Sequence, residues 1–119
     1  NASSETNLVP MSTLPLPPLE SFVKRGGRYG AHNIHENLPG PASFRSDNLI
    51  VGTFFNGGVR AFDISNAYQP QEVAYYVPGA PKLSPKGSIQ INDVWVDENR
   101  LIYTVDRFAG GLYILEMDV

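Results

Sequence analysis

The stretch that decides the fold is residues 49–64, which read LIVGTFFNGGVRAFDI. Residues 49–54 are rich in β-branched and aromatic side chains, which are typical of a β-strand. Gly57 and Gly58 predict a turn, and the alternating character of residues 59–64 predicts a second strand. The stretch is therefore expected to form a β-hairpin. Ten prolines and eleven glycines interrupt the chain, so we predict an all-β protein.

The same pattern recurs further along the chain. The pair Leu101-Ile102 repeats Leu49-Ile50 after 52 residues, and Gly110-Gly111 repeats Gly57-Gly58 after 53 residues. A repeat of about 50 residues with four short strands is typical of a β-propeller blade. The first blade is expected to have strands at 32–35, 49–54, 58–64 and 72–77, and the second at 90–96, 100–105 and 111–117. The second blade therefore lacks its outer strand.

These strands divide the chain into three parts. Residues 1–28 are predicted to be an extended, proline-rich and non-helical arm, with one possible short edge strand at Leu19–Lys24. Residues 29–86 form one propeller blade, and residues 87–119 form an incomplete final blade. Because two blades cannot close a ring, we expect the β-propeller fragment to be completed by the remaining propeller chain or by another copy of itself.

Five segments resemble the C-terminal part of bacterial LVIVD-repeat proteins. They read HNIHENLPG at 32–40, GVRAFDIS at 58–65, QPQEVAYYVPGAP at 69–81, NDVWVDENRLIYTVDR at 92–107 and GGLYILE at 110–116. The resemblance extends from Gly26 to Glu116. It implies a β-propeller of a kind that is often predicted to be exported or surface-associated, so an extracellular, periplasmic or cell-surface location is expected. Members of that family are several times longer than this chain.

Composition excludes several classes of function. The formal net charge is -3 and no basic run is present, so nucleic acid is not an expected partner. The absence of cysteine excludes thiolate catalysis and metal sites built on cysteine. No apolar run approaches the ~18 residues of a membrane-spanning helix, so no membrane span is expected.

The candidate site lies where the loops of one end of both blades meet. In a blade, the loop into the inner strand and the hairpin between the next two strands emerge at the same end, which is the default place for a ligand. The candidate ligand-binding residues there are Asn33, Asn56, Asn92 and Asp93. The candidate catalytic residues are His32, Asp106 and Arg107. Arg107 could bind a substrate carboxylate through its guanidinium fork, or the pair Asp106-Arg107 could brace neighbouring blades.

His32 and His35 are the only histidines and are the candidate metal ligands. A separation of three places two side chains on opposite faces of an extended segment, which argues against a joint chelate. His32 could still supply one ligand to a transition metal ion beside histidines of other blades, as in similar propellers that bind copper or iron. The alternative is that both histidines anchor loops by hydrogen bonds.

Two classes of function remain open from the sequence. The first is a non-catalytic scaffold that binds a ligand or a protein, which is favoured because no catalytic set is visible. The second is a metal-dependent or acid-base enzyme with its site at the channel mouth.

Overall fold

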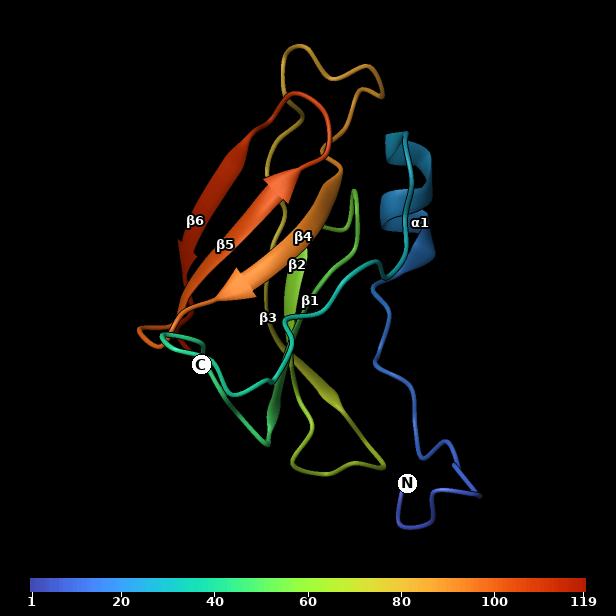
Figure 1. Cartoon of the computed structure of the whole chain (residues 1–119). Helices are drawn as coiled ribbons and strands as arrows, with labels where there is room; N and C mark the ends of the chain where they lie inside the picture. The colour runs from blue at the N-terminus through green and yellow to red at the C-terminus, as the bar shows by residue number, and fades with distance from the viewer.

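The computed structural model describes residues 1–119 and contains two antiparallel three-stranded sheets. The first sheet consists of β1 (Leu49–Thr53), β2 (Val59–Asp63) and β3 (Gln71–Tyr76). The second consists of β4 (Ile91–Val96), β5 (Leu101–Asp106) and β6 (Leu112–Glu116). Each sheet is a meander in which consecutive strands pair, and the two sheets lie against each other in Figure 1. The expected all-β class is confirmed.

An extended segment at residues 32–35 adds a fourth member to the first sheet. The His32 N–H donates to the Thr53 carbonyl over 2.9 Å, and the His35 N–H donates to the Val51 carbonyl over 2.8 Å. The segment therefore runs antiparallel to β1, with Ile34 bridged to Gly52. The predicted inner strand thus pairs with β1 as expected, but the pairing is an isolated β-bridge and does not extend into a regular strand.

The sequence repeat is preserved in the pairing of the strands. Leu49 lies opposite Asp63 in the first sheet, and Leu101 lies opposite Glu116 in the second. Leu101 follows Leu49 by 52 residues, and Glu116 follows Asp63 by 53 residues. Residues at these spacings therefore occupy matching positions in the two sheets.

The hairpin glycines also match between the two sheets. Gly58 and Gly111 have φ angles of +78° and +74°, and residues that carry a Cβ atom rarely adopt this conformation. A Cβ atom on Gly58 would lie 2.1 Å from the Tyr76 carbonyl oxygen. The double glycine thus lets the first hairpin turn directly against the end of β3.

The core lies between the sheets. Its buried side chains come from β1, β2, β4, β5 and the residue after β6: Val51, Val59, Ala61, Val96, Ile102 and Met117. Small and β-branched residues allow the two pleated faces to approach closely. Burial of this apolar area is the main force that holds the sheets together.

The N-terminal arm differs from its prediction. Leu19–Phe22 form one turn of α-helix, α1, and Val23–Arg25 continue as a 3₁₀ turn, so the expected non-helical edge strand at Leu19–Lys24 is wrong. Pro18 immediately precedes the helix, where its missing N–H costs nothing, and no proline follows until the turn has ended. The prolines therefore lie before the first helical residue and do not interrupt the helix.

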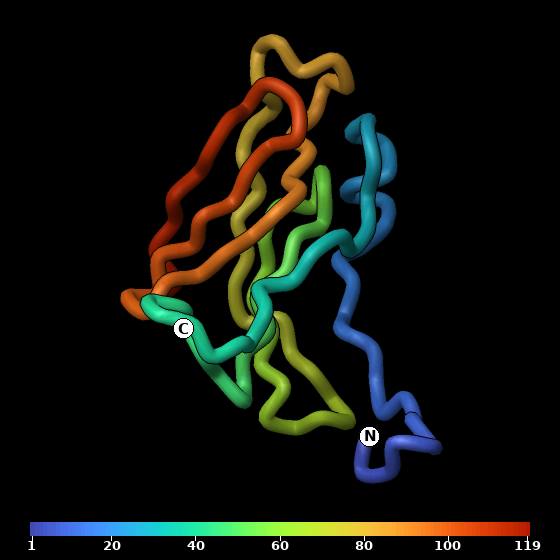
Figure 2. Tube along the Cα trace, in the orientation of Figure 1, coloured from blue at the N-terminus to red at the C-terminus, as the bar shows by residue number.

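The arm runs beside the first sheet in Figure 2, and its helical part contacts that sheet at Arg60 and the β1–β2 hairpin at Asn56. Phe22 is buried there, and the guanidinium carbon of Arg60 lies 5.1 Å from the centre of its ring. Phe54 and Phe62, on the same face, are almost completely buried. No helix in the structure is long and apolar enough to cross a membrane.

Candidate functional site

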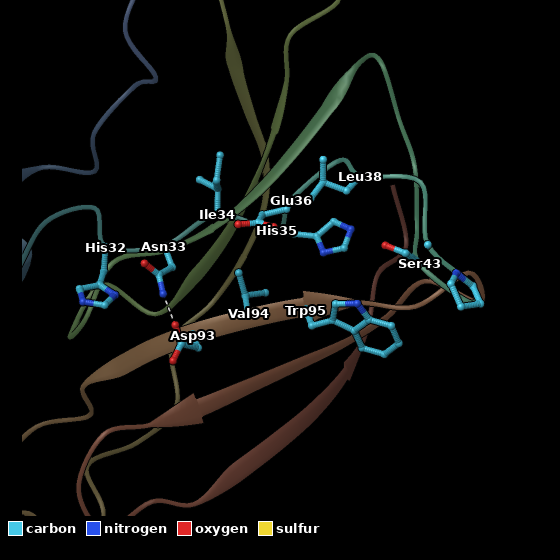
Figure 3. A pocket seen from close by; sticks show the side chains of 12 residues that line it. His32, Asn33, Ile34, His35, Glu36, Leu38, Ser43, Asp93, Val94 and Trp95 are labelled. Carbon is cyan, nitrogen blue, oxygen red and sulfur yellow. Dashed lines mark hydrogen bonds between the residues drawn. The ribbon is translucent and has the colours of Figure 1, made fainter.

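Two backbone segments run side by side along one edge of the molecule and form an open groove. These are residues 32–35 and β4, and the groove of about 760 Å³ between them continues to the loop at Leu38–Ser43. Figure 3 shows His32, Asn33, Asp93 and Trp95 around it. Residues 32–35 lie 60 positions before residues 92–95, so matching residues of the repeat line both sides of the groove.

A polar cluster holds the two sides of the groove together at one end. The Asn33 side-chain amide donates to one carboxylate oxygen of Asp93, and the Asn92 amide donates to the other over 3.1 Å. The Asn92 carbonyl accepts the Thr53 hydroxyl over 2.7 Å and lies 3.0 Å from Nδ1 of His32. The structure therefore brings together four predicted residues: His32, Asn33, Asn92 and Asp93.

His32 keeps one ring nitrogen free. A carbonyl oxygen only accepts, so the bond to Asn92 requires that Nδ1 of His32 carries the hydrogen. Nε2 makes no hydrogen bond in the chain, and the side chain is exposed. In this tautomer the Nε2 lone pair faces solvent, where it can accept a proton or a hydrogen bond, or ligate a metal.

His35 uses both ring nitrogens within the fold. Its Nδ1 accepts the Val96 N–H over 3.1 Å, which requires that Nε2 carries the hydrogen and donates to the Phe44 carbonyl over 2.9 Å. His35 therefore ties the long loop before β1 to the end of β4, and it has no lone pair left for a metal. No group of three or more histidine, aspartate or glutamate side chains is placed to hold a metal ion. A metal site at His32 stays a prediction that needs ligands from elsewhere.

Asp106 organises the turn between β5 and β6. One carboxylate oxygen accepts the Gln90 N–H over 2.6 Å, and the other accepts the N–H groups of residues 108–110 over 2.8 to 3.0 Å. All four bonds come from backbone N–H groups, and the carboxylate makes no ion pair with Arg107. Asp106 thus fixes backbone rather than facing a substrate.

Arg107 and Asn56 have different surroundings although both lie at this end. Arg107 is exposed and its guanidinium carbon lies 5.9 Å from the centre of the Phe55 ring. Asn56 is 1% exposed, and its amide donates to the Phe22 and Gly26 carbonyls, each over 2.9 Å. Asn56 therefore anchors the arm and is inaccessible to a ligand in this structure, whereas Arg107 is accessible.

Two buried polar side chains, those of Arg60 and Gln90, were not predicted from the sequence. Arg60 is 2% exposed, and its Nη1 lies 2.6 Å from a carboxylate oxygen of Glu72 on the neighbouring strand. Gln90 is 1% exposed and its side-chain oxygen accepts the Arg28 N–H over 2.8 Å. The signal for Arg60 is a cation between the apolar residues Val59 and Ala61 of a strand, since a charge at such a position needs a partner.

Three tyrosines have a raised pKa. Burial is the main cause for Tyr29, Tyr103 and Tyr113, because a phenolate loses its hydration there. The carboxylate of Asp97 raises the pKa of Tyr103 further, and that of Asp106 does the same for Tyr113. None of the three is positioned as a proton donor in the groove.

Comparisons of the chain with family models, with curated proteins and with solved structures found no match.

Proposed function

We propose that the chain is the C-terminal portion of a β-propeller and acts as a non-catalytic scaffold that binds a ligand or protein. Another polypeptide with the same repeat completes the ring. A ligand would lie at the end of the groove where His32, Asn33 and Asp93 meet. The first support is the repeat itself, because the two three-stranded meanders have matching register and propellers are built from repeated antiparallel meander sheets.

The observation that carries the proposal is the exposed apolar face of the second sheet. We call it the open face; its residues are Trp95, Tyr103, Val105, Leu112 and Ile114. Trp95 pairs with Tyr103, which pairs with Ile114, so these side chains stand in one row. Trp95 is 42% exposed, and Leu112 and Ile114 are each 57% exposed. Large contiguous apolar faces of this kind mark interaction sites.

The repeat indicates what covers the open face. Tyr103 follows Val51 by 52 residues, and Ile114 follows Ala61 by 53. Val51 and Ala61 belong to the face that the first sheet buries against the second. The open face thus corresponds to a face that is already packed on a repeat sheet, which favours a further sheet of the same repeat as its occupant.

Native mass spectrometry of the chain isolated from its source cells tests the proposal. We expect a complex whose second polypeptide has a sequence with the same double-glycine repeat. Ile114→Glu should abolish the complex because it buries a charge in the interface, and Leu83→Glu, at an 85% exposed loop residue, should leave it intact. A single 13.1 kDa chain, or a complex insensitive to Ile114→Glu, contradicts the proposal.

The enzyme remains the second candidate because of one observation, the free Nε2 of His32 beside the Asn33–Asp93 pair. The completed ring would have to supply the missing ligands or the partner acid. Metal analysis of the same complex distinguishes the two functions, since His32→Ala should abolish stoichiometric metal only if His32 is a ligand.

A further inference from the structure

A second hollow lies at the end of the molecule near the Asp106 turn, outside the groove. We call it the basic hollow; it measures about 540 Å³ and is lined by Gly27, Arg28, Lys86, Gln90, Arg107 and Phe108. Three of these six residues are cations, in a chain whose net charge is -3. No carboxylate lines the hollow, and the only ion pair in the structure is Arg60–Glu72. Positive side chains are therefore concentrated around the hollow, while the neighbouring Asp106 carboxylate is 8% exposed and is hydrogen-bonded to the N–H groups of Gln90 and Phe108.

The backbone beneath the two arginines is held by a buried side chain. Gln90 accepts the Arg28 N–H through its side-chain oxygen and donates to the Arg28 carbonyl over 3.3 Å. Its own carbonyl accepts the Arg107 N–H over 3.0 Å. Gln90, which is 1% exposed, is thus hydrogen-bonded to the backbone of both Arg28 and Arg107. These bonds hold the backbone from which the two arginine side chains extend. Such a fixed base lowers the entropy lost when the side chains bind.

The two guanidinium groups also approach the same aromatic ring. Their central carbons lie 5.7 Å and 5.9 Å from the centre of the Phe55 ring for Arg28 and Arg107, respectively. Two positive charges held near one ring repel each other, and an anion between them relieves that repulsion. Guanidinium forks match the oxygens of phosphate and sulfate groups, to which they donate paired hydrogen bonds.

The remaining wall of the hollow is apolar and indicates that the ligand also carries an organic group. Phe108 is the single apolar residue of the basic hollow, and its side chain is 48% exposed. We propose that the basic hollow binds an organic phosphate or sulfate ester, with its oxyanion between Arg28, Lys86 and Arg107 and a flat apolar group against Phe108. All of these residues come from this chain, so the proposal does not depend on the β-propeller.

Titration of the full chain with phenyl phosphate and with phenyl sulfate, at constant ionic strength, tests the proposal by NMR shifts of the amides around Gly27 and Arg107. We expect saturable binding that weakens about tenfold or more in Arg28→Gln and in Arg107→Gln, because each removes charge-assisted hydrogen bonds. Arg45→Gln is the matched control, since Arg45 is exposed and lies outside the hollow. The two esters distinguish phosphate from sulfate as the preferred group.

A second comparison tests the apolar wall. Phenyl phosphate should bind more tightly than inorganic phosphate, and Phe108→Ala should remove that advantage while leaving inorganic phosphate unaffected. Shifts that rise linearly with concentration, or an equal loss in Arg45→Gln, overturn the proposal. Equal binding of phenyl phosphate and inorganic phosphate overturns its organic part.

Discussion

Replacement of Glu72 by glutamine removes the negative partner of a buried cation. The Arg60 side chain is 2% exposed and that of Glu72 is 26% exposed, and their nearest atoms lie 2.6 Å apart. Loss of one partner from a fully buried pair costs about 3–5 kcal/mol, whereas an exposed pair contributes about 1 kcal/mol or less. With one partner buried and the other partly exposed, we expect Glu72→Gln to lower the free energy of unfolding by about 2 kcal/mol.

Urea unfolding followed by circular dichroism measures this change. Glu116→Gln is the matched control, because Glu116 is an exposed glutamate on β6 with no ion pair, and it should change stability by less than about 0.5 kcal/mol. Replacement of both partners, as Arg60→Met with Glu72→Leu, should recover much of the loss because no uncompensated charge stays buried. Equal effects of Glu72→Gln and Glu116→Gln would refute the reasoning.

Three further predictions concern other parts of the chain. The raised pKa of Tyr103 means that the folded state favours the neutral phenol. This stabilisation is present below about pH 10 and is lost as the pH rises through the pKa of Tyr103 in the folded state. Tyr103→Phe should therefore reduce the loss of stability measured in thermal scans at alkaline pH. Gly27→Ala should destabilise the chain by about 1–2 kcal/mol, because its Cβ atom would lie 2.4 Å from Nε2 of Gln90, whereas Gly79→Ala, in open space, should be neutral in thermal unfolding. Removal of residues 1–28 should cause concentration-dependent self-association in analytical ultracentrifugation, and a monomeric folded product would contradict it.

The hairpins could be predicted from the sequence because their causes are local. The alternating side-chain character of residues 49–64 and the double glycines determine where the strands end and the hairpin turns. The sequence repeat then predicts the positions of the strands in the second sheet. The helix at Leu19–Phe22 was missed because the neighbouring prolines suggested an extended chain, although the four residues themselves contain neither proline nor glycine. Pairing details also escape prediction: the register shifts between Ala61 and Phe62, and alternation alone does not reveal a bulge.

The site was predictable in position but not in role. The loops that carry His32, Asn33, Asn92 and Asp93 follow from the repeat, and the structure does place these residues together. Their roles depend on hydrogen bonds between residues about 60 positions apart, which the sequence does not specify. His35 is the clearest case, because its two partners decide that no nitrogen is free.

The two outer faces of the sheet pair differ, and in the proposed assembly this difference would set a direction. Ile50, Arg60 and Phe62 of the first sheet match Ile102, Tyr113 and Leu115 of the second by the same spacings of 52 and 53 residues. In the second sheet Ile102 and Leu115 pack toward the first sheet, whereas in the first sheet Arg60 lies against the arm.

In the proposed ring the face of a preceding sheet would lie where the arm lies here, so the arm would have to move for the ring to close. With the arm in place, another copy cannot use this face to cover the open face of its neighbour. Without the arm, one end of the molecule would present a face complementary to the other end, and such head-to-tail contacts close into rings or extend into filaments. A short segment that buries Phe22 and accepts a hydrogen bond from the Asn56 side chain thus covers part of one end of the sheet pair, and we expect it to oppose such head-to-tail contacts.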